Sequence, residues 1–277
     1  MTVLKEHVSY SEVRQWKECP WRHKLLYVDK MKSYEESPHL HYGTIIHDAN
    51  EYFLKTRELR IDETKKKIKE AWDEHGFDSE DFIHLQTQRA QLQGWKYKHN
   101  KLKDWLQWAE TSLRSLPQFM DDTFPDWEFV SAEDMLYESI ENIETKFKGY
   151  IDCIIKVPHK NRFKYWIIDW KTASGRGWSI EKQRDFLVQA QVVLYKHFWG
   201  TKEQIDMKDI QCAFVLMKKV KTIGKSCQLI KVSSGPVTLE KSKKLVRSMI
   251  KTVEKERYLK NRNSCKFCEF KDTEFCT

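Results

Sequence analysis

Two aspartates and a lysine lie in neighbouring apolar runs of the sequence, where charged residues are uncommon. Asp152 belongs to the run G-Y-I-D-C-I-I-K-V, and Asp169 and Lys171 belong to the run Y-W-I-I-D-W-K-T. The polar break P-H-K-N-R between the runs predicts a hairpin loop. If the turn is centred between Lys160 and Asn161, Asp152 and Asp169 lie opposite each other on one face of the hairpin.

These three residues could together bind a metal ion. Two like charges opposed across strands destabilise a sheet, and a divalent cation between them removes that penalty. Lys171 points to the same face as Asp169, because strand side chains alternate with a period of two. Carboxylate oxygens suit Mg²⁺ or Mn²⁺, which can polarise a phosphoryl oxygen and activate water, and a lysine can orient that water or stabilise developing charge. The set indicates metal-dependent phosphodiester hydrolysis; the alternative is two solvated edge acids and a lysine that ends a strand.

The hydrophobic pattern predicts the elements that position this set, in a fold of the α+β class with a central mixed sheet flanked by helices. A first helix is expected after Ser9, an N-cap candidate with Glu12 three residues later. Further helices are expected over residues 42–57, 62–74, 80–116, 181–199 and 238–260. Strands are expected over residues 127–137, 145–157, 163–170, 210–217 and 227–233.

Composition limits the class of protein. The chain has 277 residues, 40% of them hydrophobic, and a net charge of +8. This length suits one large domain, and the positive charge favours an anionic partner without identifying it. No apolar run approaches the roughly 20 residues that span a bilayer, and the first residues lack the apolar core of a signal peptide. We therefore expect a cytoplasmic protein that does not associate with membranes.

The cysteines form two groups. Three lie in apolar strand-like runs, and four lie near the ends of the chain: Cys19, Cys265, Cys268 and Cys276. In a reducing compartment, cysteines are more often core residues or metal ligands than disulfides. If the termini meet, four thiolates suit a 4Fe-4S cluster or a structural Zn²⁺, and spacing alone does not separate these two. A third interpretation is a pair of exposed thiols without metal.

The order of several motifs resembles a known nuclease family. Asp152 followed by Asp169-Trp170-Lys171 resembles the D…(D/E)-x-K core of the PD-(D/E)xK nuclease superfamily. Gly43–His47 and Gln191–Tyr195 resemble the G-x-x-x-H and Q-x-x-x-Y helices of its RecB-like branch. The segment Tyr10–Leu25 is similar to the N-terminal segment of members that carry an iron-sulfur cluster. Together these motifs cover nearly the whole chain.

This resemblance implies a fold and an active site. It implies one nuclease domain over residues 1–277, with a restriction-endonuclease-like core and a helical insert over residues 58–125. The implied ligands of the divalent ion are His47, Asp152, Asp169 and the backbone carbonyl of Trp170. Lys171 would be catalytic, and Gln191 and Tyr195 would line the cleft, contacting DNA or supporting Lys171.

Other interpretations of the helical motifs and a further acid stay open. Without the resemblance, His47 would be a hydrogen-bonded core residue, and Gln191 and Tyr195 would be a packing pair on one helix face. A further acid near the site is expected in the strand V-S-A-E-D-M-L-Y and around it. The candidates are Glu133 and its competitors Glu128, Asp134 and Glu138.

The resemblance to AddB-type and CRISPR-adaptation nucleases bears on the terminal cysteines. It implies that Cys19, Cys265, Cys268 and Cys276 hold a 4Fe-4S cluster, which staples residues 1–30 to residues 261–277. Seven residues separate Cys268 from Cys276 here, whereas five do in that pattern. Cys276 is therefore the position at which this sequence departs from the pattern.

The function implied is a Mg²⁺- or Mn²⁺-dependent DNA exonuclease acting on single-stranded ends. It would serve recombination, repair or DNA processing in a phage-infected or prokaryotic cell. Basic runs at residues 64–69, 96–101 and 217–221 could neutralise phosphates. Four aromatic residues could stack on bases or belong to the core: Trp95, Tyr97, Trp105 and Trp108. The alternatives are a structure-selective endonuclease, a catalytically silent DNA-binding scaffold, and a zinc-stapled enzyme with an unrelated substrate.

Overall fold

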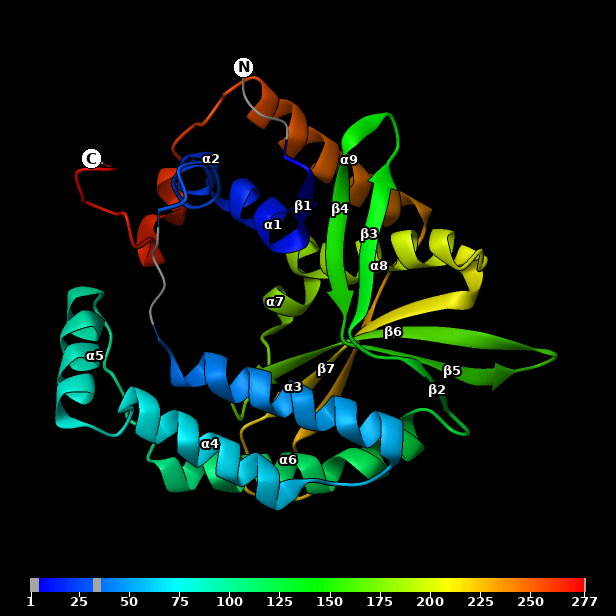
Figure 1. Ribbon diagram of the computed structural model, residues 1–277, viewed down its shortest axis with the longest axis horizontal. Helices are drawn as coiled ribbons and strands as arrows, with labels where there is room; N and C mark the ends of the chain where they lie inside the picture. The colour runs from blue at the N-terminus through cyan, green and yellow to red at the C-terminus, as the bar shows by residue number, and fades with distance from the viewer. Residues whose placement is uncertain (1–4, 32–35, 277) are drawn as a thin grey trace. The chain divides into compact units, whose positions relative to one another are not determined.

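The computed structural model describes residues 5–31 and 36–276, which divide between two compact units. Unit 1 consists of Met1–Glu35, Met135–Gly149 and Gly235–Thr277. Unit 2 consists of Glu36–Asp134 and Tyr150–Ser234, and Figure 1 shows the elements of both.

Unit 2 contains a mixed sheet of five strands in the order β2-β5-β6-β7-β8. The central strands β6 and β7 run parallel, and the other neighbours run antiparallel. Long apolar runs form these two central strands because helices cover both of their faces. The strands are β2 (Glu128–Ser131), β5 (Cys153–His159), β6 (Arg162–Ala173), β7 (Ile210–Lys218) and β8 (Cys227–Val232).

The helices of unit 2 include those that cover the two faces of this sheet. They are α3 (Pro38–Thr56), α4 (Ile61–His75), α5 (Glu80–Leu92), α6 (Leu102–Thr123), α7 (Ile180–Arg184), α8 (Phe186–Lys202) and the short η2 (Met207–Asp209). Buried residues of α3, α4 and α6 form one core cluster with β5, β6 and β7. Helix α8 packs on the other face, where the Cys212 thiol of β7 donates a hydrogen bond to the Val192 carbonyl at 3.3 Å.

Unit 1 is built on a smaller sheet and several helices. Its strands, in the order β1-β4-β3, are β1 (His7–Ser9), β3 (Asp134–Ile140) and β4 (Ile143–Ile151). Its helices are α1 (Tyr10–Glu18), α2 (Pro20–His23), the π-helix η1 (Lys24–Val28), α9 (Pro236–Glu254) and the 3-10 helix η3 (Arg262–Phe267). The predicted N-cap is confirmed, because the Ser9 hydroxyl accepts a hydrogen bond from the Glu12 amide at 3.3 Å.

The predicted α+β class, with a mixed sheet flanked by helices, is confirmed, but several predicted boundaries are wrong. The helix expected over residues 80–116 is two helices, and Gly94, with φ of +75°, lies in the connection between them. Helix α6 continues through Pro117, because Leu116 and Met120 bury apolar surface that offsets the roughly 3 kcal/mol cost of a proline. Among the described residues, no helix combines the length and apolar character needed to cross a membrane.

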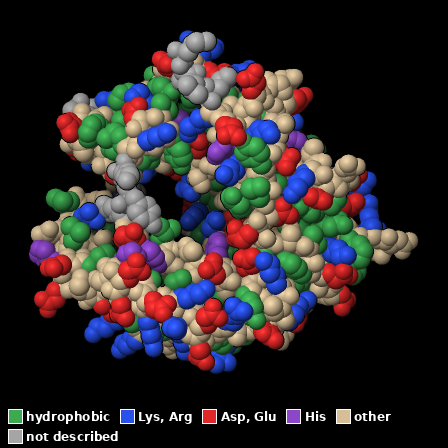
Figure 2. All heavy atoms as spheres, viewed as in Figure 1, with side chains coloured by type: hydrophobic (Ala, Val, Ile, Leu, Met, Phe, Trp, Pro, Cys, Tyr) green, Lys and Arg blue, Asp and Glu red, His purple; other side chains and the backbone are tan. Residues whose placement is uncertain are grey.

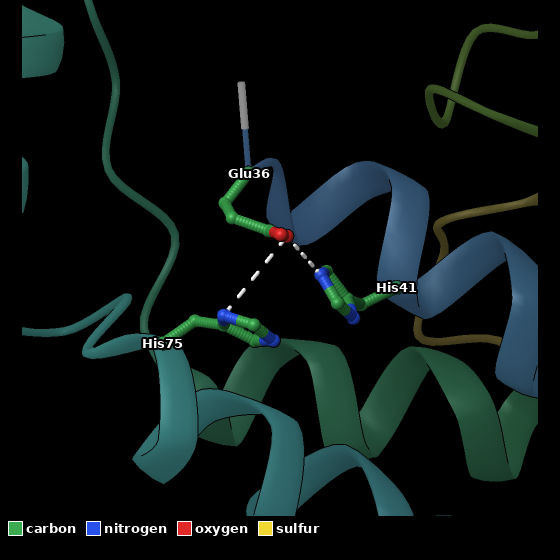
Figure 3. A group of neighbouring side chains, drawn as sticks. All are labelled: Glu36, His41 and His75. Carbon is green, nitrogen blue, oxygen red and sulfur yellow. Dashed lines mark hydrogen bonds and ion pairs between the residues drawn. The ribbon is translucent and has the colours of Figure 1, made fainter. Parts of the chain in front are cut away.

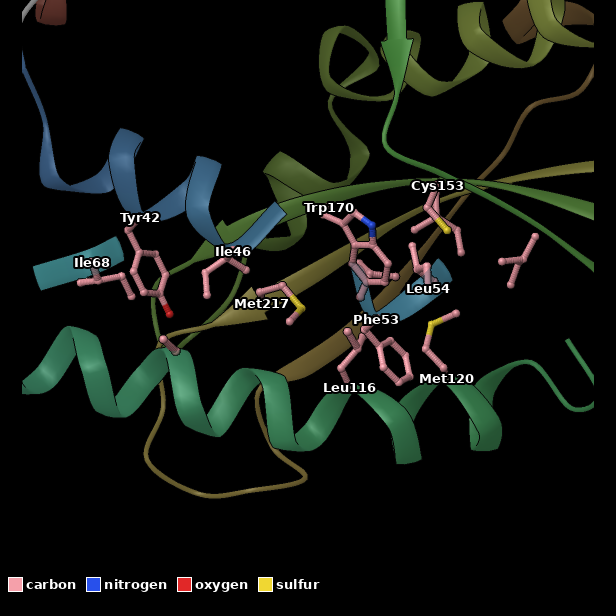
Figure 4. Packing of buried hydrophobic residues seen from close by; sticks show 14 of the residues in the cluster. Tyr42, Ile46, Phe53, Leu54, Ile68, Leu116, Met120, Cys153, Trp170 and Met217 are labelled. Carbon is pink, nitrogen blue, oxygen red and sulfur yellow. The ribbon is translucent and has the colours of Figure 1, made fainter. Parts of the chain in front are cut away.

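The core of unit 2 gives a direct stability prediction. Leu116 of α6 is completely buried against α3 and the sheet, as Figure 4 shows, whereas Leu92 of α5 is 89% exposed. Leu116→Ala is expected to lower the free energy of unfolding by about 2–5 kcal/mol, because it leaves a cavity. Leu92→Ala is expected to change it by less than about 0.5 kcal/mol. Urea denaturation followed by circular dichroism measures both, and equal losses would contradict this packing.

Candidate active site

A break between two strands places Asp152 at the start of the central hairpin. Strands β5 and β6 pair from Cys153 opposite Ile168 to His159 opposite Arg162. Extending this register by one residue sets Asp152 opposite Asp169, as the sequence predicted. The single strand expected over residues 145–157 is wrong, however, because β4 ends at Ile151 and β5 begins at Cys153.

The Asp152 carboxylate bonds to the neighbouring strand through its side chain. Its Oδ2 accepts a hydrogen bond from the Trp170 amide at 2.8 Å. A side chain therefore serves here as the acceptor for a strand amide, and this contact fixes the carboxylate beside β6.

Alternation along β6 divides its residues between the core and the site. Ile168 and Trp170 belong to the core cluster that contains α3 and α6 residues. Asp169 and Lys171 therefore point to the opposite face, which α8 covers. The parallel pairing sets Ile167 of β6 beside Cys212 of β7, whose thiol contacts α8, and so confirms which face this is.

Asp169 is a buried carboxylate with unused acceptor capacity. Its side chain is 1% exposed, and neither oxygen accepts a hydrogen bond of ordinary geometry from the described residues. The Lys171 ammonium forms an ion pair with Oδ2, which balances the charge without supplying such a bond. Leaving the oxygens of a buried carboxylate without a partner costs free energy. A divalent cation bound to those oxygens would remove this cost.

His47 reaches the two acids from α3. Its Nδ1 lies 3.6 Å from Asp152 Oδ2. Burial and the nearby Lys171 ammonium lower the pKa of His47, so the ring is neutral at neutral pH and has a lone pair for a metal. Gly43, one turn earlier, lies next to β6, where a Cβ added to it would make an ordinary van der Waals contact of 3.7 Å with Thr172 Oγ1.

Burial and neighbouring acids raise the pKa of two acids of the site, Asp152 and Glu133. Burial raises the pKa of Asp152 well above its usual range, the nearby Asp169 carboxylate adds to this rise, and Lys171 opposes it. Burial likewise raises the pKa of Glu133, with further contributions from Glu51 and Asp48. Such mutual repulsion is what a bound cation would relieve.

Among the four candidate acids near the site, the geometry selects Glu133. One ligand atom each of His47, Glu133 and Asp152 lies within 4.8 Å of the other two. By contrast, Glu128 pairs with Lys156, Asp134 pairs with Lys202, and Glu138 is not part of this group of ligand atoms. Glu133 has a positive φ of +50° in the turn between β2 and β3, and this conformation could not be predicted from the sequence pattern.

Gln191 and Tyr195 lie together on α8, which covers the face that carries Asp169 and Lys171. The Gln191 amide donates a hydrogen bond to the Tyr195 hydroxyl at 3.3 Å, and Tyr195 is 5% exposed. Their side chains therefore contact each other on the helix that covers this face of the sheet. Trp170 lies beside Asp152 through its amide, and its carbonyl stays a predicted ligand.

The terminal cysteines come together in unit 1. All four line a single pocket between α2 and the C-terminal segment: Cys19, Cys265, Cys268 and Cys276. The Asn261 amide donates to Cys19 Sγ at 3.4 Å, and the Asn261 side chain donates to the Glu18 carbonyl at 2.8 Å. All seven cysteines lie within the described residues, and none of them forms a disulfide. The predicted staple segments 1–30 and 261–277 therefore meet over their described residues, with residues 1–4 and 277 outside them.

Some residues expected to contact nucleic acid are engaged within the protein instead. Lysines of the 64–69 run pair with acids: Lys65 with Glu110, and Lys66 with Glu70 at 3.8 Å. Figure 2 accordingly shows both signs of charge interspersed over the face that carries α4 and α6. Trp105 is 2% exposed and belongs to the core, so it cannot stack on bases as the structure stands.

Comparison with known proteins identifies the family of the chain. The family model for the PD-(D/E)XK nuclease superfamily matches residues 7–273. The chain belongs to this superfamily. The crystal structure of a "putative exonuclease" from Eubacterium rectale resembles this PD-(D/E)XK nuclease with a TM-score of 0.55 and 14% sequence identity, over 95% of this chain and 86% of that one. At this identity the likeness shows the fold alone, and no curated protein matches the sequence.

Proposed function

We propose that this PD-(D/E)XK nuclease is a RecB-like, Mg²⁺- or Mn²⁺-dependent DNA exonuclease that hydrolyses phosphodiester bonds at single-stranded ends. One observation carries the proposal: the buried Asp169, with unfilled acceptors, lies beside Lys171 and opposite Asp152. The exonuclease mode follows the name of the protein that shares this fold, a "putative exonuclease", and the likeness of Gly43–His47 and Gln191–Tyr195 to RecB-like motifs supports the branch.

The proposed ligands combine hard oxygens with one imidazole. His47, Asp152, Asp169 and the Trp170 carbonyl would hold the ion, and Glu133 lies near enough to His47 and Asp152 to hold it or a water bound to it. When bound, Mg²⁺ or Mn²⁺ would polarise a phosphoryl oxygen and lower the pKa of a coordinated water. Asp152 and Asp169 repel each other, and the oxygens of the buried Asp169 accept no hydrogen bond from the described residues. Both features fit such an ion.

The remaining residues of the site would position the reactants. The Lys171 ammonium, held by Asp169, can orient the attacking water or stabilise negative charge on the phosphate. Gln191 and Tyr195, joined by their hydrogen bond on α8, would contact the DNA strand or hold the stem of Lys171. Asp152 keeps its orientation through the Trp170 amide, so the acid does not need to reorganise during the reaction.

We further propose that Cys19, Cys265, Cys268 and Cys276 bind a 4Fe-4S cluster. Four thiols around one pocket, joined by no disulfide, are a suitable donor set, and Asn261 donates an amide hydrogen bond to one sulfur. Such bonds stabilise the negative charge of cluster thiolates. The similarity to AddB-type nucleases favours iron over a structural Zn²⁺. The cluster would join two segments more than 200 residues apart and act structurally.

Cleavage of end-labelled DNA tests the proposed activity. Linear single-stranded DNA is expected to be degraded from an end in Mg²⁺ or Mn²⁺, while circular single-stranded DNA and samples with EDTA remain intact. Cleavage of circles would replace the exonuclease by a structure-selective endonuclease. Binding without any metal-dependent cleavage would favour a catalytically silent scaffold and overturn the proposal.

A further inference from the structure

A second group of possible metal ligands lies in unit 2, where α3 begins and α4 ends (Figure 3). The Glu36 carboxylate oxygen Oε2 lies 2.5 Å from His41 Nε2 and 3.9 Å from His75 Nδ1. One ligand atom from each residue lies within 4.8 Å of the other two. We propose that Glu36, His41 and His75 form a binding site for a divalent transition-metal ion, with Zn²⁺ as its preferred occupant.

The two imidazoles are held in place by their surroundings. Their ring centroids lie 4.3 Å apart, and the buried Phe77 packs against both, at 5.5 Å from His41 and 5.4 Å from His75. Gly76 ends α4 in the left-handed conformation, with φ of +58°, and this turn brings Phe77 back against the last turn of α4. The rings therefore need little reordering to bind an ion.

The donor set selects the type of metal. Two imidazole nitrogens and one carboxylate oxygen are ligands that Zn²⁺ accepts at about 2.0–2.2 Å, with water completing a tetrahedron. Small side-chain rotations suffice to bring atoms within 4.8 Å to these distances. Mg²⁺ prefers oxygen ligands and octahedral geometry, so it is a poor occupant of this site. The two sites of unit 2 thus differ in the metals they favour.

This site is separate from the nuclease centre although both use α3. His41 and His47 are six residues apart, which places them about 9 Å apart along the helix axis and about 120° around it. His41 meets His75 of α4, whereas His47 meets Asp152 beside β6. An ion held by Glu36, His41 and His75 would clamp the first turn of α3 to the last turn of α4. It would thereby stabilise the helix that carries His47.

Zinc content and thermal stability test the proposal. To keep Zn²⁺ out of the nuclease centre, every protein carries Asp152→Asn, and all are dialysed against Zn²⁺ and then buffer. The His75→Gln protein is expected to bind about one Zn²⁺ fewer per chain than the parent by elemental analysis. Zn²⁺ is expected to raise the melting temperature of the parent by about 5 °C and leave the His75→Gln protein unchanged.

A matched control and a second ligand variant keep the test decisive. His84 is an exposed histidine on α5 that bonds to Gln88, so His84→Gln removes an imidazole outside the cluster and should keep the full zinc content. If His75→Gln fails to fold, His41→Gln is measured in its place. Equal zinc content and equal stabilisation by Zn²⁺ in the ligand variant and the His84→Gln control would overturn the site.

Discussion

Asp152→Asn is expected to lower the rate of metal-dependent DNA cleavage by at least about 1,000-fold, because it removes a charged ligand and leaves Asp169 as the only acid of the opposed pair. The same substitution is expected to raise the free energy of unfolding of the metal-free protein by about 1 kcal/mol. Burial and the facing Asp169 carboxylate disfavour the charged form of Asp152, and a neutral amide removes that repulsion. The asparagine oxygen can still accept the Trp170 amide.

These opposite effects on activity and stability separate a functional role from a structural one. Initial cleavage rates in Mn²⁺ measure the effect on activity, and urea denaturation in EDTA measures the effect on stability. Asp73→Asn is the matched control, since Asp73 is an exposed acid on α4, and it should change neither quantity. If Asp152→Asn kept full activity, or lost activity only through unfolding, the proposed metal site would be wrong.

Cys268→Ala is expected to abolish the binding of iron and to destabilise the protein. The four cysteine side chains line one pocket, and the loss of one ligand leaves three thiolates for a cluster that requires four. The expected loss of stability is about 2–5 kcal/mol, similar to the loss of a covalent cross-link between distant segments. Cys276→Ala should have the same effect, because Cys276 is 8% exposed and lies in the same pocket despite the x7 gap.

Iron analysis, visible absorption and thermal melting check this prediction. Cys227→Ala serves as the control, since Cys227 lies on β8 in unit 2, outside the pocket. Full iron content and unchanged melting in Cys268→Ala would exclude the staple. Zinc in place of iron in the wild-type protein would keep the four-cysteine site but change its metal.

Much of the active site could be predicted from local rules. The turn centred between Lys160 and Asn161 sets Asp152 opposite Asp169, and strand alternation sets Lys171 on the same face; the observed register agrees. The strand break at Asp152 could not be predicted, because the apolar run continues through residues 145–157 without any turn residue. The acid's own bond to the Trp170 amide compensates for that break.

Other residues of the two proposed metal sites come together only through contacts between distant segments of the chain. The sequence pattern does not distinguish His47 from other residues of an amphipathic helix, because its place near the site depends on the packing of α3 beside β6. Only the resemblance to the nuclease family identified it as a ligand. Glu133 gains its place through a positive φ in a turn, and the group of Glu36, His41 and His75 forms only when the start of α3 meets the end of α4. Such encounters leave no periodic signal in the sequence.

The most direct measurement is the cleavage of end-labelled linear single-stranded DNA by the wild-type protein and by Lys171→Ala, with Mn²⁺ and with EDTA. Lys171 is the motif residue that holds no metal, so its substitution removes the ammonium beside Asp169 without removing a proposed metal ligand. We expect Mn²⁺-dependent shortening of the strand by the wild type and almost none by Lys171→Ala. Equal cleavage by both proteins would contradict the assignment of this site as the nuclease centre.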